Sequence, residues 1–136
     1  MTPDELQVRT KLFAQRVVKL VDALPSSVAG REIGRQLLRS ATSVGANFRA
    51  ARRGRSSREY LAKISIVVEE ADESEYWLEL IRDCGLLSKR QVGPLLQEAT
   101  ELTKIFASTR RTARANNKSP DRQITKSPNP TSKDES

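Results

Sequence analysis

The fold is predicted by residues 56–85, SSREYLAKISIVVEEADESEYWLELIRDCG. Apolar or small residues recur in this stretch at alternating spacings of four and three, at Tyr60, Ile64, Val67, Ala71, Ser74, Leu78 and Ile81. Such spacing turns one side of an α-helix toward a core. Ser56 and Glu59 have the pattern of a capping box at the start, and Gly85 is a stop signal at the end. The stretch therefore predicts one long helix with a buried face.

Two similar segments lie upstream. The first opens with Thr2, Pro3 and Glu5, which combine a capping box with a proline at the first helical position, and it ends at Pro25. Its apolar residues are Leu6, Phe13, Val17, Leu20 and Leu24. The second ends at Gly54, and its apolar residues are Ile33, Leu37, Ala41, Val44 and Phe48. Both segments are predicted to form amphipathic helices.

A fourth segment begins near Ser88, which has Gln91 as its capping-box partner. Its stripe consists of Val92, Leu95, Ala99, Leu102, Phe106 and Thr109. Pro94 leaves two alternatives: the helix starts at Gly93 and Pro94, or its first turns are kinked. Short connections make neighbouring long helices antiparallel, so we expect an all-α, antiparallel up-down four-helix bundle over residues 1–113. Residues 114–136 contain almost no apolar side chains and are predicted to be a disordered polar tail.

The composition excludes most kinds of catalytic chemistry. The chain has no histidine, and Cys84 is its single cysteine. This removes the usual general base, the usual zinc ligands and any internal disulfide. We therefore expect no catalytic residues, no metal site, no cofactor and no small-molecule substrate, and a protein that is not an enzyme. The start, MTPDEL, is unlike a signal peptide, and no apolar stretch approaches the roughly 20 residues of a membrane span, so a bacterial cytoplasmic protein is expected.

Charge is distributed unevenly along the chain, whose formal net charge is +7. Residues 26–58 contain eight arginines and a single acid, Glu32, whereas residues 59–87 contain eight acids. At about 100° per residue, five arginines of the second segment fall within an arc of roughly 80° that faces away from the apolar stripe. These five are Arg31, Arg35, Arg39, Arg49 and Arg53.

Three interpretations of this arginine face remain open. The arginines are solvated and pair with Glu69, Glu70 and Glu73 of the next helix, or they meet the acids of another subunit, or they bind phosphate. The exclusive use of arginine favours bidentate partners, which are carboxylates or phosphates. For phosphate, the candidate nucleic-acid-binding residues are Arg31, Arg35, Arg39, Arg49, Arg53 and Arg55. Aromatic residues are absent from the basic stretch except for Phe48 on the core side, so base stacking is not expected.

The third segment has a second apolar stripe on a different face. Ile66, Trp77 and Leu80 form it, and Glu70 and Glu73 flank it. Either the core face is wide and Trp77 covers the bundle, or the stripe is a subunit interface rimmed by charge. The candidate interface residues are Arg52, Ile66, Glu70, Glu73, Trp77 and Leu80.

Three stretches indicate a family: QLLRSATSVGANF at 36–48, RGRSSRE at 53–59 and EEADESEYWLEL at 69–80. In these stretches the sequence resembles the four-helix bundle proteins, also called the 23S rRNA-intervening sequence protein family, over about residues 5–113. The resemblance implies an antiparallel four-helix bundle that assembles into a ring-shaped homopentamer. It also implies kinship with the accessory protein of diversity-generating retroelements, a basic pentamer that binds nucleic acid and its reverse transcriptase. It supplies no catalytic residues.

The sequence departs from the commoner family pattern, in which Asn-Ile-Ala-Glu-Gly follows the Ser-Val motif. Here Asn47 is followed by Phe48, Arg49, Ala50 and Ala51, so the acid of the pattern is absent and an arginine stands beside its position. A function that depends on this acid in other family members is therefore not expected of this chain. The leading hypothesis is an oligomeric, non-enzymatic module that binds RNA or DNA through backbone phosphates. The alternative is a structural or adaptor oligomer whose arginines pair with the acidic third segment and bind no nucleic acid.

Overall fold

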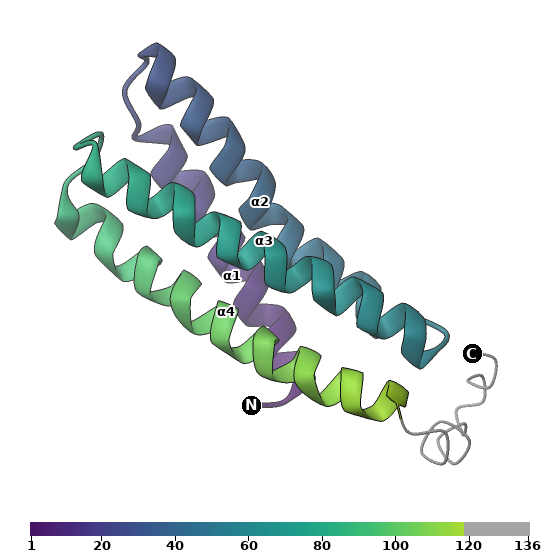
Figure 1. The fold of residues 1–136 in the computed structure, drawn as a ribbon. Helices are drawn as coiled ribbons and strands as arrows, with labels where there is room; N and C mark the ends of the chain where they lie inside the picture. The colour runs from purple at the N-terminus through teal and green to yellow at the C-terminus, as the bar shows by residue number, and fades with distance from the viewer. Residues whose placement is uncertain (119–136) are drawn as a thin grey trace.

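The computed structural model describes residues 1–118, which form four α-helices. They are α1 (Pro3–Asp22), α2 (Val28–Arg52), α3 (Ser57–Asp83) and α4 (Lys89–Lys118). Successive helices are joined by short turns and run in opposite directions (Figure 1). Each helix packs against the next one along the chain, and a smaller contact between α1 and α4 closes the bundle. The predicted antiparallel up-down four-helix bundle is confirmed.

Three of the helices begin at the capping residues that the sequence analysis predicts, which are Thr2, Ser56 and Ser88. The Thr2 hydroxyl accepts a hydrogen bond from the Glu5 backbone N–H at 3.0 Å, and the Glu5 carboxylate accepts one from the Thr2 N–H at 2.8 Å. Ser56 caps α3 in the same way, but the Glu59 carboxylate reaches one residue further back and accepts from the Arg55 N–H at 2.6 Å. These bonds satisfy backbone donors that a helix start leaves unpaired.

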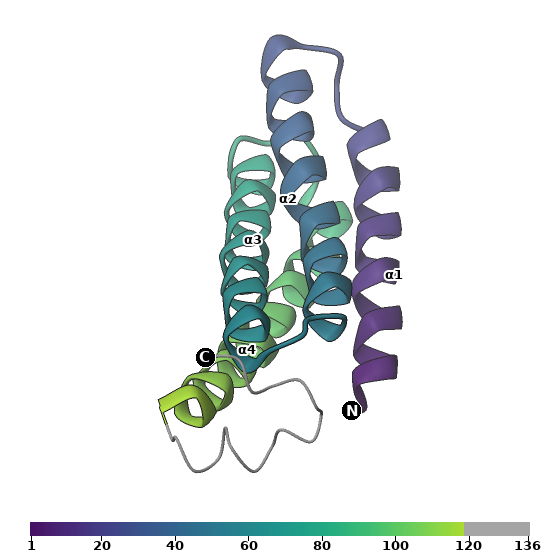
Figure 2. The same ribbon diagram turned by 90° about the vertical axis from the view of Figure 1, so that its right-hand side faces the viewer.

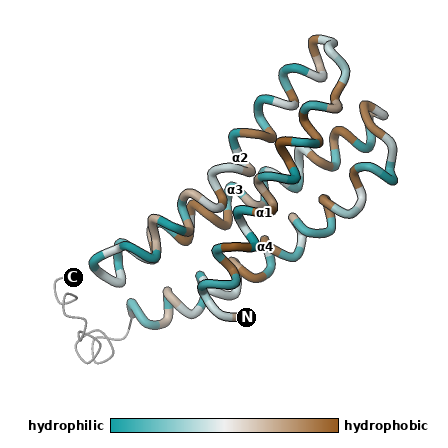
Figure 3. Tube along the Cα trace, turned by 180° about the vertical axis from the view of Figure 1, so that it is seen from behind, coloured by the Kyte–Doolittle hydropathy of each residue, from teal (hydrophilic) through white to brown (hydrophobic). Residues whose placement is uncertain are grey.

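The core follows the predicted stripes. Fully buried side chains from all four helices meet along the bundle axis, and Phe48 of α2 and Phe106 of α4 pack edge to face with their ring centroids 5.1 Å apart. Figure 3 shows hydrophobic and hydrophilic residues alternating along every helix. Two polar side chains are also buried between α2 and α3, where the Ser74 hydroxyl donates to the Ser40 hydroxyl at 3.0 Å. This bond satisfies groups that would otherwise destabilise the core.

Pro94 lies inside α4, which begins at Lys89. The alternative start at Gly93 and Pro94 is therefore wrong. The Ser88 capping box holds the first turn, with bonds of 3.0 and 3.1 Å to Gln91, and Val92 is fully buried. Gly93 also helps, because a residue without a Cβ avoids the clash that normally keeps the residue before a proline out of the helical conformation.

The helical part of the chain extends beyond residue 113. α4 continues to Lys118, and Ala113 is its last buried apolar residue. Residues 114–118 are thus helical rather than part of the predicted disordered tail, while residues 119–136 lie outside the described residues. The last turns of α4 project past the start of α1 (Figures 1 and 2). Within residues 1–118, no helix is both long enough and apolar enough to cross a membrane.

Candidate nucleic-acid interface

The arginines of α2 do not act as one stripe. Arg31 and Arg35 lie near the start of the helix and make local contacts. The Arg31 guanidinium donates to the Ser26 carbonyl at 2.6 Å, and Arg35 pairs with Glu32 at 2.8 Å. Both side chains of the Arg35–Glu32 pair are largely exposed, so this pair stabilises the helix only slightly.

Arg39 pairs with the neighbouring helix. Its guanidinium lies 2.6 Å from a carboxylate oxygen of Glu73 and 3.3 Å from one of Glu70, both on α3. The same Glu73 oxygen accepts a hydrogen bond from the Trp77 indole N–H at 3.0 Å. The bonds from Trp77 and Arg39 hold the pKa of Glu73 below its ordinary value, although partial burial opposes them. The structure therefore shows that Arg39 pairs with acids of its own chain.

Arg52 is engaged with α1. Its guanidinium donates to the Asp4 carboxylate at 2.8 Å and to the Gln7 side-chain oxygen at 2.6 Å. Sequence analysis did not predict this contact, because the side chains of α1 that face Arg52 depend on how the two helices pack. The role of Arg52 in a subunit interface stays a prediction.

A group of exposed arginines lies where α2 turns into α3. Within residues 1–118 the side chains of four arginines here form no ion pair and no hydrogen bond: Arg49, Arg53, Arg55 and Arg58. We call these four the turn arginines. The last turns of α4 lie at the same end of the bundle because α4 runs antiparallel to α3, and they add Arg111 and Arg114, which are also exposed. This end of the molecule is therefore strongly cationic.

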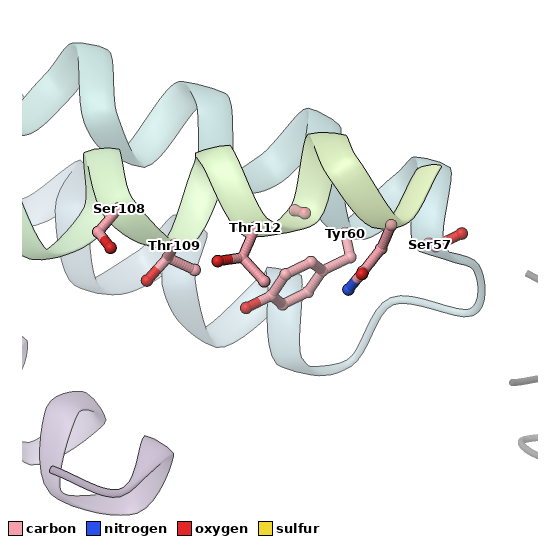
Figure 4. A pocket seen from close by; sticks show the side chains of 7 residues that line it. Ser57, Tyr60, Ser108, Thr109 and Thr112 are labelled. Carbon is pink, nitrogen blue, oxygen red and sulfur yellow. The ribbon is translucent and has the colours of Figure 1, made fainter. Parts of the chain in front are cut away.

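A polar groove lies at the cationic end, between the first turn of α3 and the last turns of α4 (Figure 4). It is lined by Ser57, Tyr60, Ser108, Thr109, Thr112, Ala113 and Asn116. The Tyr60 ring lies alongside Thr112. Burial raises the pKa of the Tyr60 hydroxyl, and the positive charge of Arg52 opposes this rise. Tyr60 therefore stays protonated at neutral pH and can donate a hydrogen bond to an acceptor in the groove.

Sequence analysis missed this groove. It placed Tyr60 and Thr109 in the core stripes, whereas both are only half-buried. The groove exists because α4 continues past the start of α1, which leaves one side of its last turns uncovered (Figure 1). The hydroxyl-bearing residues that follow Phe106 were the available signal.

The predicted interface stripe on α3 is partly occupied by contacts within the chain. Ile66, Trp77 and Leu80 are half-buried. The Trp77 ring packs against the edge of the core, and Tyr76 meets it edge to face with ring centroids 5.0 Å apart. Whether the stripe also contacts a second subunit stays a prediction.

The described residues hold no group of three potential metal ligands among histidine, cysteine, aspartate and glutamate. Cys84 is exposed at the end of α3, at the opposite end of the bundle from the turn arginines. The turn arginines and the groove at the cationic end supply guanidinium, hydroxyl and amide groups. Such groups bind the oxygens of phosphates and sugars.

The comparisons with known proteins agree with the fold. The model of the family described as 23S rRNA-intervening sequence protein matches residues 5–108. A similar solved structure is the crystal structure of a protein with unknown function from the S23 ribosomal protein family of Bacteroides thetaiotaomicron. Its sequence is 30% identical, the TM-score is 0.68, and the match covers 76% of this chain and 96% of that chain. No curated protein matches the chain.

Proposed function

Because the chain belongs to the 23S rRNA-intervening sequence protein family, we propose that it is a non-enzymatic module that binds RNA or DNA through the cationic end of its bundle. The observation that carries this proposal is the group of turn arginines. Four guanidinium groups are exposed there, and none of them is neutralised by an acid within residues 1–118. Anions supplied by a partner are the natural complement of such a surface.

The proposed contacts are with the nucleic-acid backbone. Guanidinium groups bind phosphate oxygens bidentately, and the hydroxyl groups of the nearby groove suit phosphate and sugar oxygens. The side chains of the groove include one aromatic ring, that of Tyr60, which is half-buried. We therefore propose binding that depends little on base sequence and strongly on salt.

The proposal changes the set of candidate residues. Arg49, Arg53 and Arg55 stay in it, and Arg58 joins them. Arg39 leaves it, because its guanidinium is paired with Glu70 and Glu73. Arg31 and Arg35 lie at the other end of α2, and even the nearer one, Arg35, is about 14 residues or roughly 21 Å from Arg49 at 1.5 Å per residue. They are too far away to share a compact site with the turn arginines.

The proposal also concerns the oligomeric state of the protein and the compartment in which it acts. We propose that the chain acts as a homo-oligomer, with the homopentamer implied by the family resemblance as the leading possibility. We also propose that it acts in the cytoplasm, where RNA and DNA are present. Several copies in one assembly would present several cationic ends to the same polyanion, which strengthens binding through effective concentration.

The second candidate function is a structural or adaptor oligomer that binds no nucleic acid. It is favoured by the contacts of Arg39 and Arg52, whose guanidinium groups are satisfied by acids and amides of the same chain. On this account the turn arginines serve solubility or bind an acidic protein. The two functions differ in whether the purified chain binds RNA or DNA.

The test is a binding titration with a fluorescent single-stranded RNA and a DNA duplex across a salt series. We expect the affinity to fall steeply with salt. The double variant Arg49→Gln/Arg53→Gln is expected to reduce the slope of log affinity against log salt by about 1.4 to 1.8, because roughly 0.7 to 0.9 is lost per phosphate contact.

The matched control is Arg31→Gln/Arg35→Gln, which removes the same charge from the same outward face of the same helix. We expect this control to keep nearly all of the wild-type slope. Equal losses in the two double variants would contradict a localised site. A wild-type chain that fails to bind at low salt would favour the adaptor function instead.

A further inference from the structure

We infer that the outer face of α1 docks on the outer face of α3 in a second copy of this chain, in a head-to-tail contact. This inference deepens the proposed function and rests on its homo-oligomer. It is carried by two surfaces that are not in contact within one molecule. Each surface exposes apolar side chains, and the two surfaces have charges of opposite sign.

The outer face of α1 is unusually apolar for an exposed surface. Val8, Leu12 and Val18 are 68%, 51% and 45% exposed. They lie opposite the core side of the helix, which Phe13 and Val17 already occupy. Three apolar residues over three turns of a surface helix form a patch of the kind that marks an interaction site.

Between Val8 and Lys19 the charges on this face of α1 are positive. Lys11 and Lys19 are exposed among the apolar residues, and neither forms an ion pair within residues 1–118. Leu12, Val18 and Lys19 line a shallow hollow in the surface, together with Gln15 and Arg16. The patch is therefore apolar and basic.

The outer face of α3 has the complementary character. Tyr76 is 55% exposed at the centre of this face. Asp72 lies one turn and Glu69 two turns before it on the same side, and both are exposed and form no ion pair within residues 1–118. Glu79 and Asp83 extend the acidic ridge toward the end of the helix. This patch is aromatic and acidic.

The two surfaces match in length as well as in charge. From Val8 to Lys19 is about 16 Å along α1, and from Glu69 to Glu79 is about 15 Å along α3, at 1.5 Å per residue. Leu12 lies between two basic positions, as Tyr76 lies between acidic ones. A second copy of the chain thus supplies an apolar partner and a counter-charge for each surface.

The position of the two helices sets the kind of assembly. In the bundle α1 packs against α2 and α4 but makes little contact with α3, so the outer faces of α1 and α3 point to opposite sides of the molecule (Figure 2). A symmetric pair of chains cannot satisfy both surfaces at once. Repetition of the contact closes into a ring or continues as a filament.

The experiment measures the mass of the full-length chain in solution by light scattering after size exclusion, at low salt. One variant reverses the charge on α1, Lys11→Glu/Lys19→Glu, and another reverses it on α3, Glu69→Lys/Asp72→Lys. We expect each variant alone to weaken assembly at least about tenfold, because like charges then face each other. An equimolar mixture of the two is expected to recover mixed assemblies in which most contacts join unlike chains.

The mixture is the decisive arm, since recovery shows that both variants are folded and that α1 of one chain meets α3 of another. The control Arg90→Glu/Lys104→Glu makes the same change of charge on the outer face of α4, and we expect it to assemble like the wild type. If the wild type assembles and the charge-reversal variants assemble equally well, the inference is wrong. It is also wrong if the mixture does not recover assembly, and in both cases the proposed homo-oligomer is unaffected. A monomeric wild type would overturn both, while nucleic-acid binding is tested separately by the salt series.

Discussion

At the scale of single residues, the side chain of Glu73 on α3 links this helix to α2. Its carboxylate accepts hydrogen bonds from Arg39 and from Trp77, and these two bonds lower its pKa. The charged form is therefore favoured in the folded state. The resulting stabilisation is fully present above the unfolded pKa of a glutamate, about 4.3, and is lost as the pH falls through the lower folded value.

This contact predicts the pH dependence of tryptophan fluorescence. Trp77 is the only tryptophan in the chain, so its emission reports on Glu73 directly. We expect an acid titration of the emission whose midpoint lies below 4.3, and we expect Glu73→Gln to abolish this transition. A midpoint at or above the ordinary value, or a transition that survives in the variant, would contradict the contact.

The same residues show how far the sequence alone can place a side chain. Helical geometry predicted correctly that Arg39 lies on the outer part of α2, and pairing with Glu70 and Glu73 was one of the predicted alternatives. Geometry could not choose between the alternatives, because an arginine side chain is long enough to reach a neighbouring helix, another subunit or solvent. The contact of Arg52 with Asp4 was not predicted, since it joins residues 48 positions apart.

At the scale of the helices, Pro94 is the residue most at odds with its surroundings. It lies in the second turn of α4 and has no N–H to donate to the Arg90 carbonyl. We expect Pro94→Ala to raise the free energy of unfolding by about 1 to 3 kcal/mol, because it restores this bond and removes a steric conflict. Urea denaturation measures the change.

The same substitution at Pro25 serves as the control. Pro25 lies in the turn between α1 and α2, where it restricts the unfolded chain without interrupting a helix. We expect Pro25→Ala to lower the free energy of unfolding by about 0.4 to 1 kcal/mol. A decrease in the Pro94→Ala variant as well would contradict the prediction that Pro94 destabilises α4.

Helix starts were predicted better than helix ends. The capping pairs of Thr2 with Glu5 and of Ser88 with Gln91 form the expected bonds, because capping is a local interaction between residues three apart. The end of α4 was predicted too early at residue 113. Helix propensity and the contact of Ala113 with the bundle continue the helix after the apolar pattern weakens, and neither leaves a stop signal in the sequence.

At the scale of the whole molecule, α1 is the least firmly packed helix. It packs mainly against α2 and has a smaller contact with α4. Two polar contacts fasten it: Arg9 pairs with Glu98 and Glu101 of α4 at 2.7 and 2.8 Å, and Arg52 pairs with Asp4. An element with few buried contacts opens before the rest of the domain.

This packing predicts the pattern of amide hydrogen exchange. In the double variant Arg9→Gln/Arg52→Gln, we expect exchange in α1 to accelerate by about tenfold or more, because hydrogen bonds to charged groups contribute about 1.5 to 3 kcal/mol. Exchange in α3 is expected to stay at the wild-type rate. Mass spectrometry of peptides from the two helices measures both rates, with Arg31→Gln/Arg35→Gln as the control. Equal acceleration in α1 and α3 would mean global unfolding instead.

The molecule as a whole holds the features that the sequence could not predict. The four helices and their core sides followed from spacing alone. The groove at Tyr60 depends on how far α4 projects past α1. The exposed apolar side chains around Leu12 were missed because the prediction considered only the apolar stripe on the core side of α1. The groove is thus a property of how the helices are placed relative to one another, which the spacing of apolar residues along the chain does not contain.

The turn arginines have a consequence for motion in solution. They lie at one end of an elongated bundle, whereas Asp72, Glu79 and Asp83 lie toward the other end of α3. The molecule is therefore a permanent electric dipole with a large component along its length. In the field of a polyanion it experiences a torque and rotates with its cationic end forward before any contact is made. The approach is guided, so the rate of encounter, and not only the lifetime of the complex, decreases as ions screen the field.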